Sequence, residues 1–78
     1  MSGRIFYSIV AEDETARRRI YVTDDYGSYL LARTLIGCGP HVPRALLERA
    51  LPGRSDSEGS ISITRALELL GLEERHPL

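Results

Sequence analysis

Two short segments near the N-terminus constrain the fold more than any other feature of this 78-residue chain. Residues 5–11 (Ile-Phe-Tyr-Ser-Ile-Val-Ala) and 19–23 (Arg-Ile-Tyr-Val-Thr) are rich in the β-branched and aromatic side chains typical of strands. The pattern predicts an N-terminal antiparallel β-hairpin. Its connection begins Glu-Asp-Glu-Thr and lacks glycine, so we expect a loop of about four or five residues instead of a two-residue turn.

The first strand of this hairpin needs a further neighbour. Alternation along the strand places Ile5 and Tyr7 on one face and Phe6 and Val10 on the other, so both faces are apolar. A two-stranded hairpin alone would leave such a strand underprotected. We expect the neighbour to be either residues 60–63 of the same chain or another subunit.

Three later segments have the spacing of amphipathic helices: residues 26–36, 44–51 and 64–70. The pair Asp24-Asp25 precedes the first segment and can cap it, with Ser28 as a competing cap. The last segment ends in Gly71-Leu72, a pair typical of a Schellman motif in which the glycine is left-handed and the leucine folds back onto the helix.

The region before the last helix has two interpretations. Ser60-Ile61-Ser62-Ile63-Thr64 alternates hydroxyl and apolar residues, as in a half-buried strand, but Ser60 or Ser62 could instead cap the helix. We favour a very short strand that runs into the helix. Residues 53–59 have no periodicity and are expected to form a mobile polar loop, and residues 73–78 a frayed tail.

These elements predict one small α+β domain over residues 1–78. It would consist of the N-terminal hairpin, with a possible third short strand near 60–63, packed against two or three short helices. We expect the helices to cover one face of the sheet. The other face would carry tyrosine, arginine and threonine side chains and remain open.

Charge and composition exclude several classes of function. The formal net charge is −1, which gives no long-range attraction to nucleic acid, and all ten basic residues are arginines. Arginine is enriched at protein interfaces, where lysine is depleted. No apolar stretch approaches the roughly 20 residues that span a bilayer, and the N-terminus lacks the pattern of a signal peptide. We therefore expect a cytoplasmic protein with no membrane contact.

No set of residues predicts catalysis or a cofactor. Cys38 is the single cysteine, and with only two histidines, His41 and His76, the chain has no zinc-ligand spacing. We expect Cys38 to be a partly buried small residue at the end of a helix. The alternative is an exposed thiol that links two subunits by oxidation. His41 lies three residues from Cys38, but no third group orients it. We expect no enzyme activity, no metal and no cofactor.

The hairpin carries the candidate binding residues. Three consecutive arginines follow the acidic connection, and we expect them to form an edge that resists unwanted strand pairing and to pair with the carboxylates across the hairpin. The predicted partner-binding residues are Glu12, Asp13, Glu14, Arg17, Arg18, Arg19 and Tyr21.

Nucleic-acid binding is the alternative. Tyrosines beside arginines on a sheet are a feature of proteins that bind single-stranded RNA, so Arg17–Arg19 could contact phosphates. Residues 61–72 also resemble the recognition helix of helix-turn-helix proteins, which would assign DNA contact to Arg65. However, the preceding helix ends near Leu51, and the intervening loop is far longer than the turn of that motif.

The sequence favours a non-catalytic protein-binding module with another protein or nucleoprotein complex as its partner. In its small size and its lack of catalytic or metal-binding motifs, the chain is similar to the small inhibitors encoded by phages and mobile elements, anti-CRISPR proteins among them. That class resemblance implies inhibition by occupying the surface of a partner. A chain this small also gains stability by association, so a homodimer is a further expectation.

Overall fold

The computed structural model describes residues 3–53 and 59–75, and it has the expected α+β fold. The N-terminal hairpin consists of β1 (Tyr7–Glu12) and β2 (Arg18–Thr23), joined by a connection of five residues as predicted. A third strand, β5 (Glu73–Arg75), pairs with β2, so the strand order of this antiparallel sheet is β1-β2-β5.

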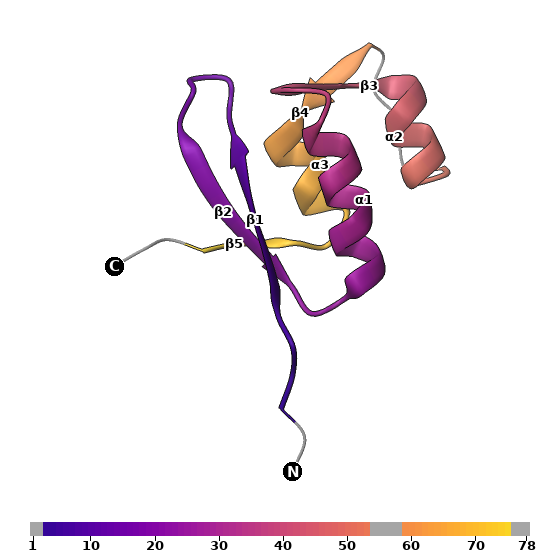
Figure 1. The fold of residues 1–78 in the computed structure, drawn as a ribbon. Coiled ribbons are helices and arrows are strands. Elements are labelled where there is room, and N and C mark those ends of the chain that lie inside the picture. The colour runs from indigo at the N-terminus through magenta and orange to yellow at the C-terminus, as the bar shows by residue number, and fades with distance from the viewer. Residues whose placement is uncertain (1–2, 54–58, 76–78) are drawn as a thin grey trace.

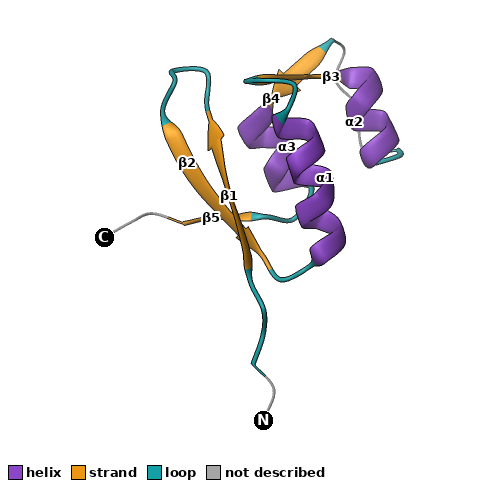
Figure 2. Ribbon diagram, in the orientation of Figure 1, coloured by secondary structure: helices purple, strands orange, loops and turns teal. Residues whose placement is uncertain are grey.

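Helices α1 (Tyr26–Ile36) and α3 (Ile63–Leu69) lie on one face of this sheet (Figure 1). A two-stranded ribbon of β3 (His41–Pro43) and β4 (Ser60–Ser62) lies beyond their ends, and α2 (Arg44–Ala50) packs against α1 and β3 on the side away from the sheet (Figure 2). Among the described residues, no helix lies on the opposite face of the main sheet.

The caps that the sequence predicts are present. Asp25 is the N-cap of α1, and its Oδ2 accepts hydrogen bonds from the backbone N–H and the hydroxyl of Ser28, both at 2.8 Å. These bonds lower the pKa of Asp25, because they favour the charged carboxylate. At the other end of the helix, Gly39 has a φ of 87°, which a residue with a side chain rarely adopts, and Pro40 follows.

The last helix also ends as predicted. Gly71 has a φ of 93°, its N–H donates to the carbonyl of Glu68 at 3.0 Å, and the N–H of Leu72 donates to Leu67 at 3.1 Å. This is the bond pattern of a Schellman motif, and Leu72 is buried against the core.

Residues 60–62 combine both interpretations from the sequence. They form β4, and the hydroxyl of Ser62 accepts a hydrogen bond from the N–H of Arg65 at 3.3 Å, so Ser62 also caps α3. However, β4 pairs with β3, not with the hairpin. The expectation that residues 60–63 would lie beside β1 is wrong. The sequence of β3, His-Val-Pro, gives no strand signal, so this partner could not be predicted.

The C-terminal segment differs from expectation as well. Residues 73–75 form β5 instead of a frayed end, because the Schellman turn at Gly71 directs the chain back along β2. Residues 76–78 and most of the expected mobile loop, residues 54–58, lie outside the described residues.

The core lies between the sheet and the helices. Its fully buried large side chains come from both sheets and all three helices: Tyr21, Leu35, Val42, Leu47, Ile63 and Leu67. Ala11 on β1 and Ala32 on α1 are also buried, and small residues here let the helix approach the sheet closely.

Candidate functional site

The tip of the hairpin is a closely hydrogen-bonded turn. Oδ1 of Asp13 accepts from the N–H of Thr15 at 2.8 Å, from the Thr15 hydroxyl at 2.6 Å and from the N–H of Arg17 at 3.0 Å. The backbone bond from the N–H of Asp13 to the carbonyl of Arg17 closes the loop at 2.9 Å. Asp13 therefore organises the turn that presents the charged residues.

The other oxygen of Asp13 binds Arg19. Arg19 Nε lies 2.8 Å from Asp13 Oδ2, and Arg19 Nη1 lies 2.9 Å from Oε2 of Glu74 on β5. The hydrogen bond from Thr15, followed by that from Arg19, lowers the pKa of Asp13, and the two carboxylates raise the pKa of Arg19. This network ties the hairpin tip to the last strand, so Arg19 is structural.

The remaining predicted charges are at the surface. Glu12 and Arg18 are exposed and lie opposite each other at the ends of β1 and β2, while Glu14 and Arg17 are exposed in the connection. The expected pairing of acidic and basic residues across the hairpin is present between Asp13 and Arg19.

Tyr21 is not a surface residue. Its side chain is fully buried on the face of the sheet that the helices cover, so the sequence prediction that it contacts a partner is wrong. Burial raises the pKa of its hydroxyl, which has no hydrogen-bond partner within the described residues. Thr23 is buried on the same face. Alternation separates the two faces of a strand, but it does not say which face the helices cover, and here the large tyrosine ring fills the core.

The open face of the sheet therefore has an apolar centre, and the tyrosine and threonine of β2 that were expected there lie on the covered face. Val10 on β1 lies opposite Ile20 on β2, and Ser8 lies opposite Val22. Phe6 and Val10 are 54% and 51% exposed, although large apolar side chains are usually covered. We call this surface the outer sheet face. Its apolar residues are Phe6, Val10, Ile20 and Val22, and its charged rim consists of Glu12, Arg18, Glu73 and Arg75.

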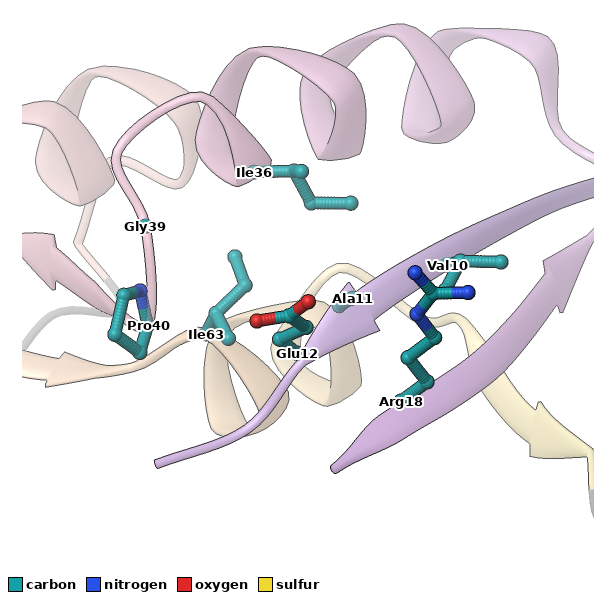
Figure 3. Close-up of a pocket in the computed structure, with 8 residues that line it drawn as sticks. All are labelled: Val10, Ala11, Glu12, Arg18, Ile36, Gly39, Pro40 and Ile63. Carbon is teal, nitrogen blue, oxygen red and sulfur yellow. The ribbon is translucent and has the colours of Figure 1, made fainter. Parts of the chain in front are cut away.

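A cleft of about 510 Å³ lies beside the end of β1 (Figure 3). It separates the hairpin from the C-terminal end of α1 and the start of α3. Most of its lining is apolar, with Glu12 and Arg18 as the charged members. The lining residues are Val10, Ala11, Glu12, Arg18, Ile36, Gly39, Pro40 and Ile63.

The tyrosines do not form an open platform for bases. Tyr7 on β1 stacks on Tyr29 of α1 with ring centroids 5.2 Å apart, and it also contacts Tyr26 at 5.3 Å. The guanidinium of Arg33 lies 5.7 Å from the centre of the Tyr29 ring. These rings join the start of β1 to α1 on the helix side of the sheet, where Tyr7 and Tyr29 are half-buried and Tyr26 is 54% exposed.

The last helix offers a single exposed arginine. Arg65 Nη1 lies 3.4 Å from Oε1 of Glu68, one turn along α3, and both side chains are more than half exposed. Cys38 lies in the turn after α1 and is exposed, unlike the partly buried side chain that the sequence favoured.

Within residues 3–53 and 59–75, no cluster of three or more His, Cys, Asp or Glu side chains could hold a metal ion. No helix in the same ranges has the length and apolar character needed to cross a membrane. Comparisons of the chain with protein-family models, curated proteins and solved structures found no match.

Proposed function

We propose that this chain is a non-catalytic protein-binding module and that the outer sheet face is its binding surface. The observation that carries the proposal is the exposure of Phe6 and Val10 beside Ile20 and Val22 on a face that no helix covers. An apolar centre with a charged rim is the usual arrangement of a protein interface.

The ion-pair network of the hairpin also supports a role in binding a partner surface. The Asp13–Arg19–Glu74 network joins the hairpin tip to β5, so it cross-links the strands that carry the outer sheet face. A preorganised surface loses little conformational entropy on binding. Such a module acts by covering the surface of its partner, which is how small inhibitors of the anti-CRISPR kind work. We propose this mode of action, with a protein or nucleoprotein complex as the partner.

The nucleic-acid alternative has less support. Of the three consecutive arginines, Arg19 is held by two carboxylates, and Arg65 on the last helix pairs with Glu68. Arg17 and Arg18 are exposed, but Glu12 and Glu14 lie close to them in the hairpin. These carboxylates offset the positive charge that phosphate binding requires.

The proposal is tested by the variant Ile20→Glu. Ile20 lies opposite Arg75, so the new carboxylate has a cation beside it and the sheet is expected to remain folded. We expect the tagged chain to capture a defined set of host proteins from lysate and Ile20→Glu to lose them. The control Ala45→Glu places the same charge on the exposed side of α2 and should keep them.

A second measurement separates the two functions. Binding of labelled single- and double-stranded nucleic acid is measured over a range of salt concentrations with the parent chain and with Arg17→Ala/Arg18→Ala. Affinity that falls steeply with salt and disappears in the double variant would overturn the protein-binding proposal. Capture that Ile20→Glu and Ala45→Glu retain equally would also overturn it, because the outer sheet face would not be the contact.

A further inference from the structure

The two edges of the main sheet are very different. The outer edge of β5 is three residues long, and all three residues are charged, which discourages pairing with another strand. The edge of β1 is six residues long, contains no proline and carries a charge only at Glu12. An apolar edge of this length is a template for another strand.

The backbone of β1 has groups available for that strand. The N–H of Asp13 bonds to Arg17, and the register continues without a bulge from Glu12 opposite Arg18 to Tyr7 opposite Thr23. Because backbone groups point to alternate sides along a strand, the odd-numbered residues bond to β2. The even-numbered residues, Ser8 and Val10 among them, direct their N–H and C=O groups to the free edge.

The charges along this edge are self-complementary. Arg4 precedes β1, and Glu12 ends it. If two copies of β1 pair antiparallel with Ser8 opposite Ser8, Arg4 of each copy lies opposite Glu12 of the other, and Phe6 lies opposite Val10. Arg4 forms an ion pair with Asp24 at 3.4 Å, and its side chain is 77% exposed. Such an exposed pair contributes little, so Arg4 is available for Glu12.

The same register also matches an exposed apolar side chain to the cleft. The segment before β1 is extended (Figure 1). Ile5 belongs to this segment, and its side chain is 68% exposed. In the antiparallel pair, Ile5 lies opposite Ala11 of the other copy and, by alternation, on the helix side of the sheet. Ala11 lines the cleft together with Ile36 and Ile63 (Figure 3). Each copy therefore supplies one apolar side chain for the cleft of the other.

We propose that a second copy of this chain pairs antiparallel along the free edge of β1. Ser8 lies at the twofold axis, Arg4 lies opposite Glu12, and Ile5 enters the cleft of the other copy. The dimer joins two three-stranded sheets into one sheet of six strands. It uses the edge of β1, whereas the proposed partner surface is the outer sheet face, so it does not rest on the proposed function.

The first test is sedimentation equilibrium of the whole chain over about a hundredfold range of concentration, where a dimer shows a mass that depends on concentration. Arg4→Glu and Glu12→Arg should each weaken the dimer about tenfold or more, since each places like charges opposite each other twice. The double variant Arg4→Glu/Glu12→Arg should restore it. Arg17→Glu, an exposed change outside the paired residues, should leave the dimer unchanged.

The second test fixes the register. With Cys38→Ser to remove the exposed thiol, Ser8→Cys should form a disulfide-linked dimer on mild oxidation, because only pairing centred on Ser8 places that residue opposite itself. Ser60→Cys, at an exposed position of β4 outside the main sheet, is the matched control and should remain monomeric on a denaturing gel. Far-UV circular dichroism establishes that each variant is folded.

Three results would overturn the proposal: a monomer at every concentration, a dimer that both single charge reversals leave intact, or a dimer in which Ser8→Cys does not cross-link. The variant Ile20→Glu keeps the tests independent. This variant places a charge in the apolar centre of the outer sheet face, so it should lose partner capture and still form the dimer. Loss of capture and loss of the dimer are therefore measured separately.

Discussion

At the scale of single residues, the hairpin tip combines one strained position with one strongly bonded position. Ala16 has a φ of 63°, the left-handed region that L-residues with a side chain rarely adopt. Asp13 accepts four hydrogen bonds or ion contacts around it, from Thr15, Arg17 and Arg19. The bonds to Asp13 stabilise a turn in which Ala16 is strained.

Replacing Ala16 with glycine should therefore stabilise the protein. Relief of the left-handed strain outweighs the entropy that glycine adds to the unfolded chain, and we expect the free energy of unfolding to rise by about 0.5 to 1 kcal/mol. Denaturant unfolding measures the change. The matched control is Ala45→Gly in the exposed part of α2, where the same substitution should lower stability by about 1 kcal/mol. A loss of stability in Ala16→Gly would show that the backbone at Ala16 is not strained.

Asp13 should make stability depend on acid pH. Its pKa is lowered in the folded state, so its contribution is fully present above its ordinary value of 3.8 and is lost as the pH falls below that value. We expect Asp13→Ala to lower the Tm at pH 7 and the difference from the parent to shrink between pH 4 and pH 2.

Thermal unfolding at several pH values measures this difference. Glu14→Ala, at an exposed position of the same connection, is the control and should leave the Tm at pH 7 almost unchanged. A difference between Asp13→Ala and the parent that stays constant down to pH 2 would show that the turn does not depend on the carboxylate charge.

At the scale of elements, the turn after α3 determines where β5 lies. The left-handed glycine at position 71 and the bonds of the Schellman motif direct residues 73–75 along β2, where Glu74 reaches Arg19. A short strand of three charged residues has no signal of its own. Its position follows from the preceding helix end, and its pairing follows from the ion pair with the hairpin.

Gly71→Ala tests this dependence. A Cβ at Gly71 would meet no atom within 4 Å, so the cost is that of the backbone conformation alone, and we expect a loss of about 1 to 2 kcal/mol. Gly27→Ala, near the start of α1 in a right-handed helix, should be neutral or slightly stabilising. Equal unfolding midpoints for the two variants in urea would contradict the role of the turn.

At the scale of the whole molecule, the sheet has one covered face and one open face. The helices cover the face that carries Tyr21 and Thr23, whereas Phe6 and Val10 remain exposed on the other. An exposed apolar face and an unprotected apolar edge on the same small sheet are costly for an isolated chain in water. The proposed protein-binding role would cover the face, and the proposed β1-edge dimer would cover the edge.

The sequence by itself determined the local elements: the hairpin, the caps of α1 and α3 and the Schellman turn at Gly71 depend on residues close together in the chain, so their signals are local. It also indicated that the first strand has apolar side chains on both faces. Only the tertiary structure decided which face is buried, because alternation is symmetric between the two sides of a strand and the packing of α1 and α3 breaks that symmetry. It also decided that residues 60–62 pair with β3, since a contact between distant segments depends on the path of the whole chain.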